Sequence, residues 1–306
     1  MVTPRDLQIL QALCRYRYLR SSHFYPLIGG KSRRRFIERL GVLYHEAGYI
    51  ERPARQWQAL NARYMPAIYE LSAAGELVLR EHGLASESNP LLHRGKGMGF
   101  LFQHELMVCD ILASIEIGIR ERPELRFISG QEILANAPRA TQQARAPFDI
   151  PVSISHRFAR SVETCNKALA PDALFGIEYP RGEKRNVRFF ALEADRDNEP
   201  VTRNNLEQTS FLRKLLQYQR VLASKTYQSH LGLPNLHVLT VTTSEGNQKR
   251  IMELLSELTD GKGHAFMLFR TMPSLASHGH APPPTPFILD TPWQRAGHPD
   301  FYIDRL

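Results

Sequence analysis

The chain has 306 residues, 42% of them hydrophobic, and carries a formal net charge of +8. This length exceeds the usual size of one domain and predicts two domains, each with its own core. No apolar stretch is long enough to cross a bilayer, and the N-terminus lacks the segments of a signal peptide. Three widely spaced cysteines without a CxxC pair argue against a disulfide scaffold and a structural zinc. We therefore expect a soluble cytoplasmic protein.

The N-terminal part of the chain predicts three helices in succession. The first begins at Thr3, with Pro4 at its first position and Asp6 where a capping box places an acid. The second runs from residue 21 to residue 28 and ends at a pair of glycines, and the third spans 32–46 with an apolar side and an arginine side.

A hairpin and a fourth helix follow the three helices. Short apolar runs at 49–52 and 67–71 predict two strands around a polar loop, and 71–83 predicts a helix. Three helices, a hairpin and a further helix are the order of a winged helix-turn-helix, which we predict for residues 1–82.

Basic residues gather where that motif would meet DNA. In a winged helix-turn-helix the third helix enters the major groove with its N-terminal residues, and the wing contacts the backbone or the minor groove. Arginine grips guanine edges or phosphates, so we expect DNA contacts from these residues. The predicted DNA-binding set is Lys31 just before the third helix, Arg33, Arg34, Arg35 and Arg39 on that helix, and Arg55 and Arg63 in the wing loop. The alternative is a solvated basic face on a protein-docking winged helix, and the clustering favours DNA.

The second half of the chain predicts alternating strands and helices after a linker. Residues 83–100 are rich in glycine and serine and lack periodicity, so we predict an interdomain linker there. The expected elements after it are a helix at 101–121, strands at 125–134, 171–179 and 187–196, a helix at 204–224, a strand at 236–244, a helix at 247–261 and a strand at 264–272. An irregular insert (135–170) and an irregular C-terminal arm (282–306) complete the predicted domain, 101–306.

This order predicts a mixed α+β or α/β chain whose second domain has a central sheet with helices on both sides. The αβββαβ order resembles the core of restriction-endonuclease-like folds, the PD-(D/E)xK nucleases. In that resemblance Asp172 matches the aspartate that opens the second core strand, and Glu193 the acid near the end of the third. Two neighbouring carboxylates repel unless a divalent cation joins them, and such oxygen ligands suit Mg²⁺ or Mn²⁺.

The lysine of the nuclease pattern is missing, because Asp195 stands in its place. The resemblance implies that Lys214, on the following helix one turn before Tyr218, takes the relocated lysine's role. It also implies that Glu105 is an additional acid. The expected catalytic residues are therefore Asp172, Glu193 and Lys214, and the expected metal ligands are Asp172, Glu193, Asp195 and Glu105, with Mg²⁺ or Mn²⁺ as the cofactor of an active enzyme.

Simpler interpretations of these residues stay open. Lys214 also suits a solvated helix face, Glu105 an exposed one, and Asp172 a turn cap. Asp195, followed by Asp197, also suits the plain end of a strand.

As a whole, the chain resembles the replication-relaxation family of plasmid and mobile-element proteins. The likeness rests on TPRDLQIL at the N-terminus, YELSAAGELVL after the wing, HELMVCD, the PD strand, LEADR and the spacing of Lys214 and Tyr218. The resemblance implies a DNA-associated role in plasmid replication, mobilisation or its control.

Three hypotheses of function remain. The first is a DNA-binding protein whose nuclease-like domain is catalytically silent. The second is an active magnesium-dependent DNA endonuclease. The third is a winged-helix transcriptional regulator whose second domain dimerises or senses a ligand. The expected partners are double-stranded DNA, other proteins at a plasmid origin or promoter, and a second copy of the chain, but no membrane.

Overall fold

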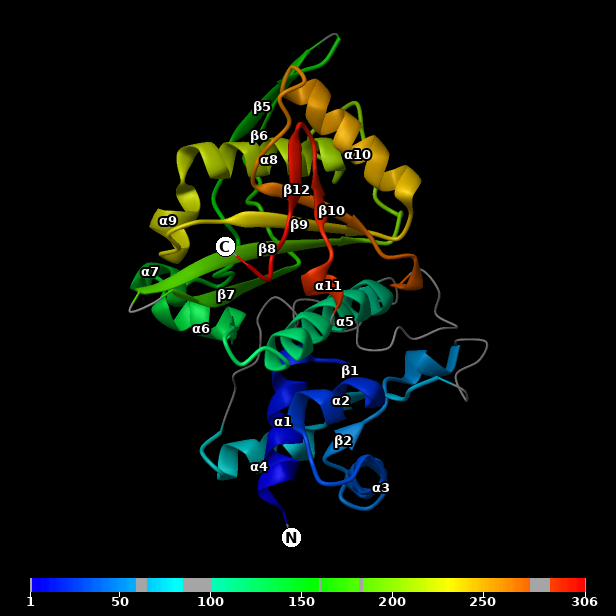
Figure 1. Cartoon of the computed structure of the whole chain (residues 1–306). Coiled ribbons are helices and arrows are strands. Elements are labelled where there is room, and N and C mark those ends of the chain that lie inside the picture. Colours follow the sequence, from blue (N-terminus) through cyan, green and yellow to red (C-terminus); the bar gives the residue numbers. More distant parts are fainter. Residues whose placement is uncertain are drawn as a thin grey trace. The chain divides into compact units, whose positions relative to one another are not determined.

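The computed structural model has a mixed α+β fold, as the sequence predicts (Figure 1). It describes residues 2–58, 65–84, 101–159, 161–181, 184–275 and 287–305. Contacts divide the chain into two compact units: unit 1 is Met1–Pro123 with Ser277–Leu289, and unit 2 is Glu124–Ala276 with Asp290–Leu306. The predicted linker lies largely outside the described residues, so the domain boundaries drawn around it stay a prediction. Within the described residues, no helix combines the length and apolarity needed to span a membrane.

The helices of unit 1 follow the capping signals of the sequence. They are α1 (Pro4–Tyr16), α2 (Ser21–Ile28), α3 (Arg33–His45), α4 (Ala73–Glu81) and α5 (Leu101–Arg120). The capping box predicted between Thr3 and Asp6 is present, with each side chain accepting from the other residue's backbone N–H. Ser32 caps α3 in the same way by accepting from the N–H of Arg35. These local signals therefore place the helix starts where the sequence predicts them.

A small antiparallel sheet connects these helices. Within the described residues of unit 1 its strands are β1 (Leu19–Arg20), β2 (Ile50–Glu51) and β3 (Ile68–Leu71), in the order β1-β3-β2. A 3₁₀-helix, Ala54–Gln58, lies in the connection between β2 and β3, where the sequence predicts only a loop.

Three ion pairs join α5 to the first helix and the strand after it. The pairs are Arg15–Glu116 at 3.1 Å, Arg17–Glu105 at 2.6 Å and Arg20–Asp110 at 2.9 Å. Helix α5 also packs against α2 and β1. The helix therefore belongs to the core of unit 1, a packing that the sequence does not indicate because its partners lie far along the chain.

Unit 2 is built on a sheet that is seven-stranded within the described residues, in the order β12-β11-β10-β9-β8-β7-β4. The strands are β4 (Arg126–Ile128), β7 (Ala173–Arg181), β8 (Lys184–Asp195), β9 (His237–Thr242), β10 (Met267–Thr271), β11 (Trp293–Arg295) and β12 (His298–Phe301). Strands β8, β9 and β10 run parallel, and the remaining neighbours are antiparallel. The helices are α6 (Gly130–Asn136), α7 (Arg139–Gln142), α8 (Phe211–Ser224), α9 (Thr226–Leu231) and α10 (Glu245–Leu258). The short helix α11 (Phe287–Asp290), which precedes β11, belongs to unit 1 up to Leu289.

Several segments of unit 2 differ from the sequence expectation. The helix predicted at 204–224 begins only at Phe211, because Ser210 caps it there by accepting from the N–H of Arg213. The strand predicted at 125–134 is strand only in β4, because Ser129 caps a new helix, α6, by accepting from the N–H of Glu132. The insert predicted to be irregular contains α7 and a hairpin of β5 (Ile154–Arg157) and β6 (Val162–Cys165).

The C-terminal arm, predicted to be irregular, instead extends the sheet through β11 and β12. Trp293 of β11 is fully buried. Tyr179 anchors the end of the arm, because its hydroxyl donates to the carbonyl of Ile303 at 2.5 Å. The arm is ordered by contacts with strands distant in sequence, which local propensity does not report.

Candidate functional site

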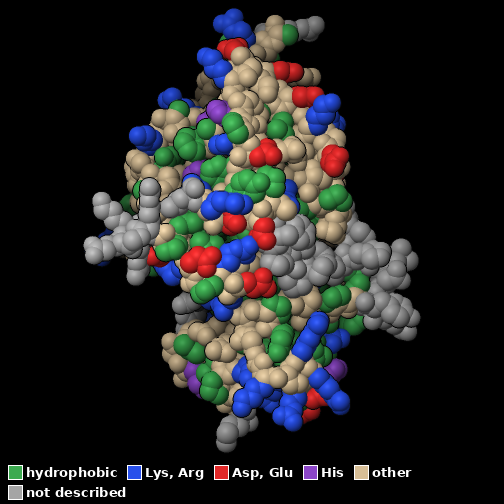
Figure 2. All heavy atoms as spheres, in the orientation of Figure 1, with side chains coloured by type: hydrophobic (Ala, Val, Ile, Leu, Met, Phe, Trp, Pro, Cys, Tyr) green, Lys and Arg blue, Asp and Glu red, His purple; other side chains and the backbone are tan. Residues whose placement is uncertain are grey.

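Helix α3 presents its first turn to solvent. The helix buries Phe36, Leu40 and Leu43 on its inner side. Lys31 and the three arginines at 33–35 are exposed. Figure 2 shows Lys and Arg side chains gathered at the foot of the view, over α3. The structure thus leaves these predicted DNA-binding side chains on an open surface.

Not every basic residue of this helix is equally available. Arg34 forms an exposed pair with Glu38, one turn on, at 2.9 Å. Arg39 forms two hydrogen bonds with the carboxylate of Asp6, at 2.8 and 2.6 Å. Burial of Asp6 raises its pKa, but the bonds from Arg39 and Thr3 outweigh this and leave the pKa lowered. Arg39 therefore ties α3 to α1, and its predicted DNA contact would compete with that bond.

Of the two arginines predicted to bind DNA from the wing loop, the structure describes Arg55. Arg55 is half-buried on the 3₁₀-helix. Arg63 lies outside the described residues, so its predicted role stays a prediction.

A second group of charged residues lies in unit 2, where β7, β8 and α8 meet. The antiparallel register pairs Ala173 with Leu192, which sets Asp172 beside Glu193. Glu193 is buried and faces α8, where Lys214 and Tyr218 are one turn apart. The structure therefore brings together the three residues that the sequence proposes as catalytic.

Lys214 lies between two carboxylates. Its Nζ is 2.8 Å from Oε2 of Glu193 and 2.7 Å from Oε2 of Glu199, and only 19% of its side chain is exposed. The hydroxyl of Tyr218 donates to Oε1 of Glu193 at 2.5 Å. The alternative of a solvated Lys214 is therefore wrong, because the side chain is buried in an ion-pair cluster.

Asp172 belongs to the same cluster through its charge. Its Oδ2 accepts from the backbone N–H of Ala194 at 2.8 Å, and its own N–H donates to the carbonyl of Leu192 at 3.0 Å. Its carboxylate also acts electrostatically on both Glu193 and Lys214. Asp172 therefore continues the β7–β8 ladder while adding negative charge beside Glu193.

The protonation of this cluster is shifted by burial and by its own charges. Burial raises the pKa of Glu193 to about 7, with a further rise from Asp172 and an opposing effect from Lys214. Burial by itself lowers the pKa of Lys214, but the carboxylates around it raise that pKa well above its usual value. The arrangement therefore holds a charged ammonium beside a carboxyl that exchanges its proton near neutral pH.

Two of the predicted metal ligands have other partners. Oδ2 of Asp195 accepts from the side-chain amide of Asn247 at 2.6 Å, and Oδ1 accepts from the backbone N–H of Glu199 at 3.3 Å. Glu105 lies in unit 1, where it pairs with Arg17. In the described part of the chain, no group of three or more His, Cys, Asp or Glu side chains is placed to hold a metal ion.

Glu199 is the residue of this cluster that the sequence does not single out. It follows the end of β8, after a turn in which Asp197 has a φ of 59°. Its Oε1 is buried and has no hydrogen-bond partner. The only local signal is a run of acids after a strand, and it does not show which of them turns back toward Lys214.

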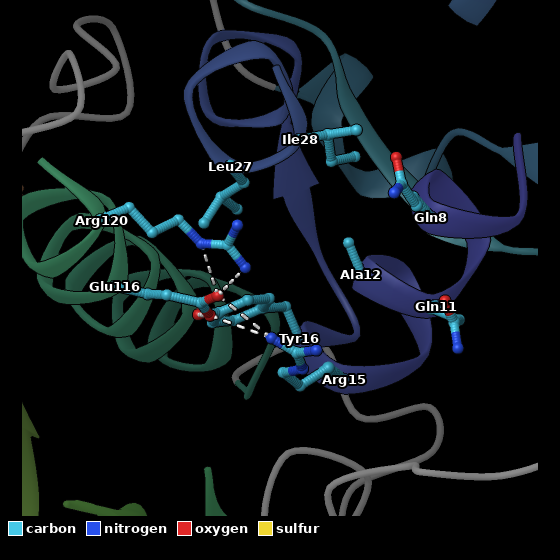
Figure 3. A pocket seen from close by; sticks show the side chains of 9 residues that line it. All are labelled: Gln8, Gln11, Ala12, Arg15, Tyr16, Leu27, Ile28, Glu116 and Arg120. Atoms are coloured by element: carbon cyan, nitrogen blue, oxygen red, sulfur yellow. Dashed lines mark hydrogen bonds and ion pairs between the residues drawn. The ribbon is translucent and has the colours of Figure 1, made fainter. Parts of the chain in front are cut away.

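A polar pocket of about 130 Å³ lies in unit 1. Figure 3 shows Glu116 at its wall, held between Arg15 and Arg120. The carboxylate also accepts from the hydroxyl of Tyr16. Burial tends to raise the pKa of Glu116, but the two arginines and Tyr16 outweigh it and leave the pKa lowered. The contacts with Arg15 and Tyr16 thus hold α1 to α5, while Arg120 pairs with Glu116 within α5.

Comparison with known proteins finds a family to which the chain is similar. The model of a protein family described as replication-relaxation matches residues 10–236. No curated protein and no solved structure matches the chain.

Proposed function

The chain belongs to the replication-relaxation family, and from this premise we propose that it is a DNA-binding protein acting in the replication or mobilisation of a plasmid or mobile element, or in its control. Membership of the family points to that general role. The observation that supports DNA binding is the exposed first turn of α3, with Arg33, Arg34 and Arg35 in succession.

Three features of this turn favour a DNA contact. The helices and the β1-β3-β2 sheet follow one another in the order of a winged helix-turn-helix, whose third helix reads the major groove. The positive end of the helix dipole adds to the charge of the arginines. Arginine side chains can bind either phosphates or guanine edges. The proposal is that unit 1 places this turn of α3 in the major groove.

The test is duplex binding by a variant in which Arg33, Arg34 and Arg35 are all alanine. Each contact is expected to contribute about 1–3 kcal/mol, so affinity should fall by at least about 100-fold. The slope of log affinity against log salt should also become shallower, because fewer counterions are released. Lys249→Ala, an exposed lysine on α10 in unit 2, is the matched control and should bind like the wild type. Equal binding by the triple variant and the control would exclude α3 as the DNA-contacting helix.

The cluster around Glu193 supports a second candidate function, metal-dependent DNA cleavage. A relocated lysine of a PD-(D/E)xK nuclease should lie next to the acid that ends the third core strand. Lys214 is 2.8 Å from Glu193, and Asp172 acts on both. This proximity is what the resemblance to these nucleases requires of the three residues.

Two of these residues carry the carboxylates that a divalent cation would need. Mg²⁺ in nucleic-acid enzymes is held by one or two carboxylates, with waters and substrate phosphates completing its shell. Asp172 and Glu193 would supply the two carboxylates, and a bound cation would polarise a phosphodiester. Asp195 would need to give up its bond from Asn247 to join them. Lys214 would keep its charge beside the site through Glu199.

Supercoiled plasmid incubated with Mg²⁺ or Mn²⁺ tests this candidate. Nicking by the wild type that is lost in the Asp172→Ala/Glu193→Ala double variant, but retained in Glu253→Ala, would support an enzyme. Glu253 is an exposed acid on α10 and controls for the loss of negative charge. If the wild type and the double variant are equally inactive, unit 2 is catalytically silent, as in the first hypothesis.

A further inference from the structure

Trp57 is a large aromatic side chain that is left open to solvent. It lies on the 3₁₀-helix between β2 and β3, and 52% of it is exposed. The other tryptophan of the chain, Trp293, is fully buried. Exposure of an indole is unfavourable in water, so a partner that covers it would gain binding energy.

The segment that carries Trp57 is firmly attached to the sheet. The side-chain amide of Gln56 donates to the carbonyl of Ile68 at 3.1 Å, and the N–H of Ile68 donates back to the same amide's oxygen at 3.2 Å. A third bond runs from the Gln56 amide to the carbonyl of Pro53 at 3.4 Å. The indole is therefore presented by an anchored turn, so little conformational entropy is lost when it binds.

Arg52 supports the ring from the side of the sheet. Its guanidinium lies 5.9 Å from the ring centroid of Trp57 and stacks on Tyr44 and Tyr69 at 4.6 and 5.1 Å. It also donates to the hydroxyl of Tyr69 at 3.0 Å. The arginine is thus fixed in place beside the indole and brings a positive charge to it.

The surroundings of Trp57 favour a nucleobase over an apolar protein surface. Within the described residues the other exposed large apolar side chains are Ile37, Leu77, Val162 and Phe266, and none of them lies on the 3₁₀-helix of Trp57. Protein docking sites usually need a contiguous apolar patch. A single aromatic ring beside Arg52 instead matches the stacking platforms of proteins that bind unpaired nucleic acid.

We propose that Trp57 stacks on an unpaired base, so that the protein binds duplex DNA containing an unpaired segment more tightly than fully paired duplex. This inference rests on the proposed DNA-binding function and adds a second contact to that of α3. The wing would recognise the unpaired base while α3 holds the adjoining duplex.

The experiment compares Trp57→Ala, Trp57→Phe and wild type on two labelled oligonucleotides at one salt concentration, a paired duplex and the same duplex with a central unpaired loop. Stacking contributes about 1–3 kcal/mol per base, so Trp57→Ala should lose about 5- to 150-fold in affinity for the looped DNA. It should lose little on the paired duplex, and Trp57→Phe should retain most of the binding. Leu77→Ala, an exposed apolar residue on α4, is the matched control.

Intrinsic fluorescence gives a second readout on the wild-type protein. Because Trp293 is buried, quenching by the looped oligonucleotide should come from Trp57 and should disappear in Trp57→Phe. The inference would be overturned if Trp57→Ala lost affinity equally for both DNAs, or if it lost no affinity and the looped DNA quenched no fluorescence. Either result would leave the role of α3 intact. Failure of the wild type to bind either DNA would overturn the proposed function together with this inference.

Discussion

Replacement of Lys214 by methionine should expose the energetics of the charged cluster in unit 2. Methionine keeps most of the length of the side chain and removes the charge together with its hydrogen-bond donors. In the wild type the ammonium contacts Glu193 at 2.8 Å and Glu199 at 2.7 Å. Loss of one partner of a buried pair leaves an uncompensated charge, which costs about 3–5 kcal/mol of folding free energy.

The size of this loss should depend on pH, because Glu193 can take up a proton. Burial already raises its pKa to about 7, and loss of Lys214 removes the main effect that lowers it. A carboxyl whose folded pKa is raised contributes most stability below its unfolded pKa, near 4.5, and loses it as pH rises through the folded pKa. The loss of folding free energy in Lys214→Met should therefore be larger at about pH 8.5 than at about pH 5.5. It should grow by up to about 1.4 kcal/mol per pH unit across the titration of Glu193.

Urea unfolding, followed by the fluorescence of the buried Trp293, measures the free energy of unfolding at each pH. The measurement uses a Trp57→Phe background, which removes the signal of the other tryptophan. A Glu193→Gln/Lys214→Met double variant should regain much of the lost stability, because the glutamine carries no charge. Lys249→Met, at an exposed position on α10, should change stability by less than about 0.5 kcal/mol. A deficit that is the same at both pH values, or a double variant no more stable than the single one, would refute the assignment of a buried, proton-exchanging Glu193.

Two further predictions concern packing and a buried imidazole. Gly75→Ala should lower the melting temperature of unit 1, because a Cβ there would lie 2.2 Å from the carbonyl oxygen of Tyr49. Gly41→Ala, whose Cβ would meet nothing within 4 Å, should instead stabilise unit 1 by about 0.5–1 kcal/mol, and equal shifts in melting temperature for the two variants would contradict the close approach at Gly75. Burial lowers the pKa of His237 to about 4, so unit 2 should lose up to about 3 kcal/mol of folding stability from this group as pH falls from 6.5 to 4. Urea titrations at several pH values should show a weaker pH dependence for His237→Phe, and an unchanged dependence would show that other groups cause it.

The lysine cluster shows where sequence reasoning succeeds and where it stops. Asp172, Glu193 and Lys214 could be proposed together because a known nuclease pattern supplies their spacing. Glu199 could not, since its approach to Lys214 depends on the path of the chain after β8. Asp195 was proposed as a metal ligand from its strand position, but its bond with Asn247 requires the start of α10 to lie beside it.

The sequence alone determined the features that depend on neighbouring residues: the capped starts of α1 and α3, the helix ending at Gly29, the apolar strands β8 and β9, and the succession of arginines on one helical turn. Backbone hydrogen bonding and side-chain periodicity act over a few residues, so a local pattern is enough to predict them. Only the tertiary structure decided that Arg39 binds Asp6, that α5 packs in unit 1, and that the C-terminal segment adds strands to the sheet. Each of these joins segments far apart in the chain, and their pairing depends on which buried surfaces and charges fit together in three dimensions.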